Sequence, residues 1–155
     1  MSRNALLRSG KGLETPGTTR ITAAPERAAE LDDHFVVRNG VRCAGAHLII
    51  DLYQAERLDD IAHIDQTLRA CVEASGATLL HIHLHRFEPN GGVSGVAVLA
   101  ESHISVHSWP EHGYAALDVF MCRNANPDAC VPVLREAFAP KRIAVGEHLR
   151  GVAAG

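Results

Sequence analysis

The chain has 155 residues, of which 46% are hydrophobic and 21% are charged, a composition typical of a single globular domain. Its formal net charge of −3 gives no reason to expect nucleic acid or an anionic membrane as a partner. No apolar run approaches the roughly 20 residues that span a bilayer, so we expect a soluble, cytoplasmic protein without a membrane partner.

The first part of the chain differs in composition from the rest. Residues 1–33 are rich in Gly, Thr, Arg and Ala and have no sustained apolar period, which predicts a flexible N-terminal extension with a short helical turn around Pro25–Leu31. A folded domain is expected over residues 34–155. The 4 cysteines form no CxxC pair and do not indicate a disulfide framework.

Strand and helix patterns alternate through the first half of this domain. Ala46–Tyr53 is apolar and β-branched enough for a buried strand. Leu58–Ser75 has apolar residues on one face at helical spacing, and Gly76 is a natural stop for that helix. Thr78–Phe87 alternates strictly between apolar and polar residues and predicts another strand, followed by a turn-rich loop over Glu88–Gly95.

The second half predicts a hairpin, a helix and a last strand. After a short strand at Gly95–Ala100, the segments Ile104–Trp109 and Tyr114–Met121 form a hairpin around a Pro-Glu-His-Gly turn. A helix over residues 127–138, which Pro132 should bend, precedes a strand at Lys141–Glu147. The order β-α-β-β-β-α-β suggests an α+β fold: an antiparallel sheet with helices packed on one face, a two-layer sandwich.

Three histidines alternate along the strand predicted over Thr78–Phe87. Every second residue of a strand shares a face, so His81, His83 and His85 would lie about 6.6 Å apart at successive steps. Alternating histidines can serve a zinc site when a further ligand comes from elsewhere. A metal-binding protein that uses this strand is therefore an alternative function, although no spaced Cys, Asp or Glu completes the ligand set. The other reading of the strand is a solvated or half-buried face that is rich in histidine.

The predicted hairpin concentrates a hydroxyl, imidazoles, a carboxylate and a thiol. If Trp109 pairs with Tyr114, the residue numbers of cross-strand partners add to 223, and position 102 faces the residue before Cys122. Ser102 and Cys122 then become neighbours in space. In a regular strand, Ser102 and His107 would point to opposite faces. If the two side chains cooperate, we expect Ser102 to lie in irregular backbone just before the strand.

Several stretches resemble a known family. The stretches are HLIIDLY at His47–Tyr53, LHRF at Leu84–Phe87, VSG at Val93–Gly95 and ESHISVHSWPEHGYAALDVFMC at Glu101–Cys122. Together they closely resemble the prokaryotic S-adenosylmethionine decarboxylase proenzymes, the short pyruvoyl-dependent type, from about Gly45 to Gly151.

The resemblance implies that the chain is a zymogen that cleaves itself between Glu101 and Ser102. Ser102 would become the pyruvoyl group, the cofactor that forms a Schiff base with the substrate amine and acts as an electron sink. Ser94 and His107 would assist processing, His107 as a base and Ser94 as a donor to the oxyanion. Cys122 would return a proton to Cα after decarboxylation.

The resemblance also implies a substrate and an assembly. Phe87 and Glu111 match positions that the family uses to hold the adenine and ribose of the substrate. The implied reaction converts S-adenosylmethionine to decarboxylated S-adenosylmethionine and CO₂ for spermidine biosynthesis, with no metal. A homologue that decarboxylates ornithine or arginine, and a member that never cleaves, remain open alternatives. By analogy with the family we expect a homodimer of cleaved protomers.

Overall fold

The computed structural model describes residues 34–152 of the chain. The predicted N-terminal extension, residues 1–33 with its helical turn, lies outside the described residues. In chain order the elements are β1 (Val36–Arg38), β2 (Val41–Cys43), β3 (Gly45–Tyr53), α1 (Ile61–Ser75), β4 (Leu79–Arg86), β5 (Val93–Leu99), β6 (Ser102–Trp109), β7 (Tyr114–Met121), α2 (Cys130–Phe138) and β8 (Arg142–Arg150). Short 3₁₀ turns occupy Pro110–His112 and Pro127–Ala129.

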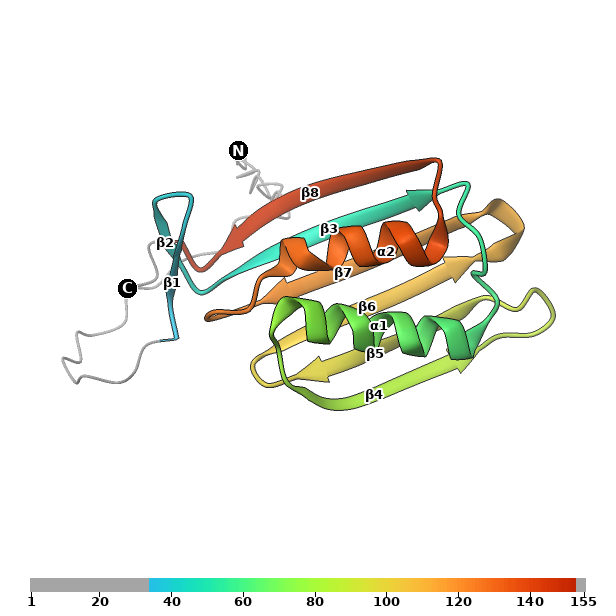
Figure 1. The fold of residues 1–155 in the computed structure, drawn as a ribbon, viewed down its shortest axis with the longest axis horizontal. Helices are drawn as coiled ribbons and strands as arrows, with labels where there is room; N and C mark the ends of the chain where they lie inside the picture. The colour runs from blue at the N-terminus through green and yellow to red at the C-terminus, as the bar shows by residue number, and fades with distance from the viewer. Residues whose placement is uncertain (1–33, 153–155) are drawn as a thin grey trace, which may run out of the picture. The chain divides into compact units, whose positions relative to one another are not determined.

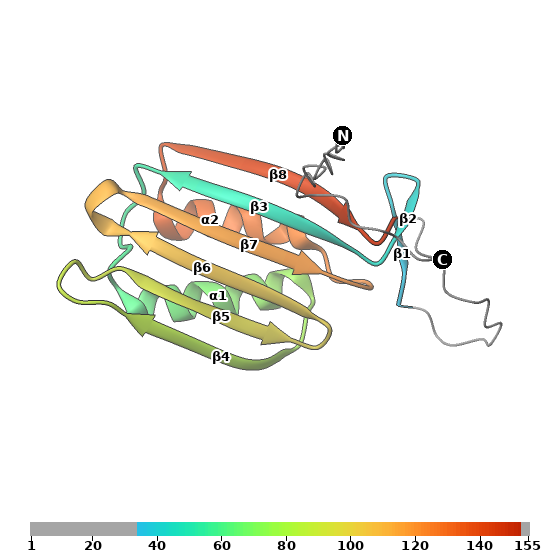
Figure 2. The same cartoon turned by 180° about the vertical axis from the view of Figure 1, so that it is seen from behind.

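Two layers make up the fold. Strands β4-β5-β6-β7-β3-β8 form a six-stranded sheet in that spatial order, and every neighbouring pair is antiparallel. Helices α1 and α2 lie side by side over one face of the sheet (Figure 1). Figure 2 shows the opposite face, which no helix of residues 34–152 covers. The predicted α+β sandwich, with an antiparallel sheet and helices on one face, is confirmed.

The expected order of elements is wrong by one strand. Four strands, β4 to β7, separate α1 from α2, where the order β-α-β-β-β-α-β has three. The four strands predicted individually between the two helices are all present, as β4 to β7, so the order β-α-β-β-β-α-β leaves out one arm of the hairpin around Pro110–His112. The small hairpin of β1 and β2 was also not expected, because strands of three residues are too short to show a period in the sequence.

Alternating side chains explain how the sheet builds its core. In β3, Leu48, Ile50 and Leu52 are buried toward the helices, while the residues between them are more exposed. They pack in one cluster with the buried face of α1, which includes Ile64 and Leu68. Burial of each such side chain contributes about 1.5–3 kcal/mol, so the alternation stabilises the two layers against each other.

Local capping sets the helix boundaries. Helix α1 begins at Ile61, three residues later than expected, because the carboxylate of Asp60 accepts a hydrogen bond of 3.0 Å from the His63 N–H and caps the helix. It ends at Gly76, as predicted, with φ 73°. The second helix starts with a 3₁₀ turn, so Pro132 lies in the first turn of α2, where its missing N–H breaks no hydrogen bond.

Strand β5 begins earlier than predicted, at Val93. Ser94 therefore belongs to a strand and not to the preceding loop. The reason lies at Gly95, where a Cβ would overlap the carbonyl oxygen of His83 on β4. The absence of a side chain lets the two strands approach closely and pair, with Leu84 opposite Gly95. None of the helices within residues 34–152 is long and apolar enough to cross a membrane.

Candidate active site

The hairpin of β6 and β7 has the predicted register. Trp109 pairs with Tyr114 and His103 with Phe120, so the residue numbers of cross-strand partners add to 223 along the whole hairpin. Ser102 starts β6 and is buried, with 9% of its surface exposed. The Cys122 N–H donates a hydrogen bond of 3.1 Å to its Oγ. The prediction that Ser102 and Cys122 are neighbours in space is confirmed.

Irregular backbone occurs at Glu101, one residue before Ser102. Glu101 has φ 70°, in the left-handed region that residues with a Cβ rarely adopt. Its carboxylate Oε2 lies 2.6 Å from Arg123 Nε and 3.4 Å from His34 Nδ1. Ser102 itself is paired with Leu99 in the regular ladder, so the expectation that it lies outside the strand is wrong. Strained backbone next to a reactive hydroxyl is common at functional sites.

A pocket of about 270 Å³ opens at this end of the sheet. Its lining includes Glu101, Cys122 and Arg123, together with residues that follow α1. Pockets that enclose a whole small ligand usually measure about 300–1,000 Å³. The pocket is therefore slightly smaller than most pockets that enclose a whole small ligand.

The thiol of Cys122 is suited to donate a proton. Burial raises its pKa, and the charge of Glu101 and the neighbouring Cys43 raise it further. The thiol therefore keeps its proton at neutral pH. Gly45 makes room for it: a Cβ at Gly45 would lie 2.6 Å from the Met121 carbonyl oxygen and 3.1 Å from Cys122 Sγ.

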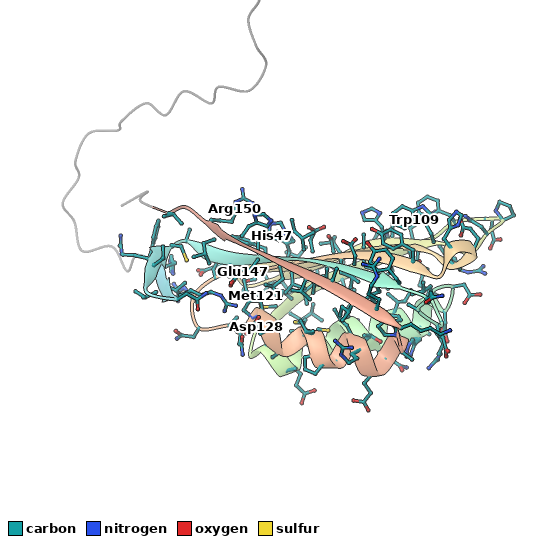
Figure 3. The ribbon with its side chains drawn as sticks, turned by 90° about the horizontal axis from the view of Figure 1, so that it is seen from above. His47, Trp109, Met121, Asp128, Glu147 and Arg150 are labelled. Carbon is teal, nitrogen blue, oxygen red and sulfur yellow. The ribbon has the colours of Figure 1, made fainter. Side chains whose placement is uncertain are left out.

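Ser94 and His107 form a second pair of candidate site residues, after Ser102 and Cys122. They are direct partners in the ladder of β5 and β6, and Ser94 Oγ lies 2.8 Å from His107 Nδ1. Both side chains lie on the face of the sheet without helices, since the neighbouring Val93 and Ser108 are buried on the other face. Figure 3 shows Trp109, the next residue on the same face of β6, at the opposite end of the sheet from His47.

The pair Ser94 and His107 lies far from the pair Ser102 and Cys122 within one chain. His107 is five residues after Ser102 on β6, which corresponds to about 16 Å along the strand. The alternation of burial also places Ser102 on the helix-covered face and His107 on the other. A proton therefore cannot pass directly between the two side chains of one chain.

The candidate substrate residues lie at the His107 end. Phe87 follows β4 and is half exposed, with its backbone N–H bonded to the Gly92 carbonyl at 2.7 Å. Glu111 lies in the 3₁₀ turn between β6 and β7 and accepts a hydrogen bond of 3.0 Å from Asn90 Nδ2. This contact joins the β4–β5 and β6–β7 connections, so Phe87 and Glu111 lie on adjacent loops.

The histidine-rich strand is exposed as the alternation predicts. His81, His83 and His85 are exposed on β4, at the edge of the sheet. Within residues 34–152 there is no group of three or more His, Cys, Asp or Glu side chains that could hold a metal ion. The structure therefore gives the metal-binding alternative no support.

Sequence reasoning missed the partners of Glu101 and a polar network on the helix-free face. In that network Asp118 accepts from Ser105 Oγ at 3.0 Å and lies 3.0 Å from His47 Nε2. Burial, together with the nearby His47, lowers the pKa of His103 and keeps its ring neutral. The predicted register of the hairpin already placed Ser105 opposite Asp118, which was a usable signal. Nothing in the sequence connected His34 with Glu101.

Comparisons with known proteins agree on one family. The sequence profile of the S-adenosylmethionine decarboxylase family matches residues 46–151. The chain is 43% identical over 113 residues to the S-adenosylmethionine decarboxylase proenzyme of Thermomicrobium roseum, covering 72% of this chain and 97% of that protein. It is 44% identical over 110 residues to the proenzyme of the same name from Methanococcus aeolicus, covering 69% and 93%.

A solved structure leads to the same family. The adenosylmethionine decarboxylase of Aquifex aeolicus superposes with a TM-score of 0.63 at 34% sequence identity, covering 70% of this chain and 92% of that one. The segment that the family profile matches, residues 46–151, contains Ser102, Cys122, Ser94 and His107. The chain therefore belongs to the S-adenosylmethionine decarboxylase family.

Proposed function

We propose that this protein is a self-processing decarboxylase that converts S-adenosylmethionine to decarboxylated S-adenosylmethionine and CO₂. The observation that carries the proposal is the junction at the start of β6. There a buried Ser102 follows a residue in the left-handed backbone conformation and accepts the Cys122 N–H at 3.1 Å. The name proenzyme, which the relatives carry, fits a chain that must be processed at such a junction.

Self-cleavage needs side chains of this protein and one water molecule. Ser102 Oγ attacks the Glu101 carbonyl carbon, the peptide C–N bond breaks, and an ester with a free Ser102 amine remains. A base then removes the Ser102 Cα proton, and the Glu101 carboxylate leaves. Water replaces the nitrogen as ammonia, so that Ser102 ends as a pyruvoyl group. His107 is the proposed base, and the Ser94 hydroxyl stabilises the oxyanion of the first step.

The residues around Ser102 fit a pyruvoyl group at the head of β6. Its position at the start of a strand leaves a new chain end beside the pocket of about 270 Å³. The pyruvoyl carbonyl supplies the electron sink that decarboxylation of an α-amino acid requires. Cys122, whose raised pKa keeps the thiol protonated, holds the proton that Cα takes up after CO₂ leaves.

We infer that the working unit is a homodimer of cleaved protomers that share their active sites. Ser102 and Cys122 lie at one end of the sheet, while Ser94, His107, Phe87 and Glu111 lie at the other. If a second copy packs against the first in the opposite direction, the Ser102 end of each chain lies beside the His107 end of the other. The dimer then has two complete sites. The helix-free face carries histidine, aromatic and acidic side chains that are partly or fully exposed, and it is the surface on which such a copy would pack.

Complementation between two inactive chains tests this arrangement. A chain carrying Ser102→Ala and one carrying His107→Ala are co-expressed with different tags, and mixed dimers are isolated and weighed by intact mass. The Ser102 of the His107→Ala chain then meets an intact His107 from the other chain, so that chain should be cut while the other stays whole. A His107→Ala chain that remains uncut in mixed dimers would refute shared sites.

Substrate choice is tested by product analysis of the cleaved wild-type protein. It is incubated separately with S-adenosylmethionine, ornithine and arginine, and released CO₂ and the amine product are measured. We expect turnover with S-adenosylmethionine alone, because Phe87 and Glu111 are suited to hold an adenine and a ribose. Release of CO₂ from ornithine or arginine instead would assign the chain to the alternative within its family.

A further inference from the structure

Two consecutive residues hold both sides of the proposed cleavage site. The Cys122 N–H donates to Ser102 Oγ at 3.1 Å, and the guanidinium of the next residue, Arg123, binds the Glu101 carboxylate at 2.6 Å. The dipeptide at the end of β7 therefore contacts the residue before the scissile bond through an ion pair and the residue after it through a hydrogen bond.

A third group joins this cluster from another part of the chain. His34 Nδ1 lies 3.4 Å from Glu101 Oε2, and its Nε2 lies 2.9 Å from Arg123 Nη2. His34 precedes the β1–β2 hairpin, which is fixed to the sheet and to the α2 side by Arg38. Arg38 binds Asp128 at 2.6 Å and also contacts Glu147. Figure 3 shows Asp128 and Glu147 close together on the helix side of the sheet.

Glu101 needs such support because of its backbone. A glutamate with φ 70° places its Cβ against its own carbonyl group, and an unrestrained residue would relax to negative φ. Attack by Ser102 Oγ requires the Glu101 carbonyl carbon in one orientation, and loss of that orientation slows a reaction between groups that are held near attack. An ion pair on the side chain restricts the backbone that carries it.

We propose that Arg123 is a positioning residue for self-cleavage, with His34 as a second support, and that it holds the Glu101–Ser102 peptide in the reactive orientation through the Glu101 carboxylate. This inference rests on the self-cleavage proposed above. Arg123 forms and breaks no bond: the Ser102 Oγ–C bond forms, the C–N bond breaks, and the hydroxyl proton ends on the released amine. His34 and the β1–β2 hairpin precede the segment that the family profile matches, which begins at residue 46.

The experiment measures the first-order rate of cleavage of freshly synthesised full-length chain, followed by gel and intact mass. Arg123→Ala should cleave about five- to tenfold more slowly, since an exposed ion pair contributes up to about 1 kcal/mol, a factor of about five, and His34 also loses its contact with Arg123 Nη2. Arg123→Lys should recover part of the rate, because it keeps the positive charge but lacks the planar guanidinium that can donate two hydrogen bonds to one carboxylate. His34→Ala should slow cleavage by about twofold.

Arg69→Ala is the matched control. Arg69 is likewise an exposed arginine bound to a carboxylate, Asp65 at 2.5 Å, but it lies on α1 away from the junction, so cleavage should keep the wild-type rate. Glu101→Gln should slow cleavage as much as Arg123→Ala, and the double variant should be no slower than either single one. Additive slowing would mean that Arg123 does not act through Glu101, and it would overturn the inference.

The outcomes separate this inference from the proposed function. A wild-type chain that never cleaves would refute the proposed self-processing itself. If the wild type cleaves and Arg123→Ala cleaves at the same rate, with the same melting temperature, only the role of Arg123 is overturned. If Arg123→Ala does not fold, Glu101→Gln decides alone, since it keeps the arginine and the size of the side chain; a wild-type rate for that variant would overturn the inference.

Discussion

The two ends of strand β6 carry different candidate residues of the proposed reaction. At its beginning, Ser102 is buried on the helix side, and the Cys122 N–H contacts its hydroxyl at 3.1 Å. Toward its end, His107 is exposed on the other face and paired with Ser94 at 2.8 Å. The first end has a strained residue and a protonated thiol, while the second has an imidazole and the loops that carry Phe87 and Glu111, the candidate substrate residues.

This difference shows how a β-strand separates residues that are close in sequence. Five residues extend about 16 Å in a strand, whereas a helix would bring positions 102 and 107 to within about two turns of one another. Residues twenty apart, Ser102 and Cys122, meet across the hairpin instead. The sheet thus holds Ser102 and His107 of one chain apart, which is why the proposed function needs a second chain to complete the site.

Removal of the Ser102 hydroxyl should have the largest effect on the proposed division of roles between the two ends of β6. Ser102→Ala should abolish both cleavage and decarboxylation, because without the hydroxyl no ester can form and no pyruvoyl group can follow. The wild type should separate into residues 1–101 and 102–155, and the smaller piece should have a blocked N-terminus. Gel analysis and intact mass of the two proteins check this. An active protein that consists of a single uncut chain would contradict the mechanism.

Changes at the other end should stop maturation at a later step. His107→Ala should slow processing by about 10²–10⁴-fold, the contribution of a general base, and leave the chain at the ester. Hydroxylamine, which cleaves esters, should cut this variant and leave Ser102→Ala whole. Ser94→Ala should slow processing less, by about fivefold, as expected for one hydrogen bond. If both His107→Ala and Ser102→Ala resist hydroxylamine, His107 acts before the ester forms.

Cys122 lies at the Ser102 end, and its proposed role begins only after maturation. Cys122→Ala should retain appreciable cleavage and lose turnover by about 10²–10⁴-fold, because it removes the proton donor alone. Protonation at the wrong carbon should also convert the pyruvoyl group to alanine, which N-terminal sequencing of the small chain would detect. Cys71→Ala, which removes a thiol on the buried face of α1, is the control and should keep turnover. Wild-type turnover without Cys122 would leave His103 as the next candidate donor.

The pH dependence of turnover tests the same thiol. A thiol donates its proton only while it is protonated, and burial raises the pKa of Cys122 above its ordinary value. The loss of kcat on the alkaline side should therefore lie above about pH 8.5, the ordinary thiol value. Measurement of kcat from neutral to alkaline pH checks this. A loss of kcat that begins below the ordinary thiol range would contradict the role of Cys122 as donor.

The smallest expected effect concerns the strands that hold the His107 end. Gly95→Ala would place a Cβ against the His83 carbonyl oxygen and push β4 away from β5. We expect a loss of about 1–3 kcal/mol in the free energy of unfolding, typical of overpacking, measured by denaturant unfolding. Gly146→Ala is a control, since a Cβ there meets no atom closer than 3.9 Å. Equal stability of the two variants would show that β4 can move away from β5 without a loss in the free energy of unfolding.

Short-range features of this protein followed from the sequence alone. The pairing of β6 with β7 was predictable because a tight turn fixes the register of the strands on both sides of it. The alternation of apolar residues predicted strands β3 and β4 and the face of each strand that packs on the helices. Gly76 marked the end of α1. Such features depend on neighbours within a few residues, which a linear pattern records.

Only the tertiary structure decided which distant groups meet. The insertion of β3 between β7 and β8 brings His47 to Asp118, and the β1–β2 hairpin brings His34 to Glu101, although neither pair leaves a mark on local periodicity. The same holds for the regular start of β6, which places Ser102 and His107 on opposite faces at opposite ends. Strand order and long-range contacts result from burial of the whole sheet against two helices, so they become visible only when all the elements are packed together.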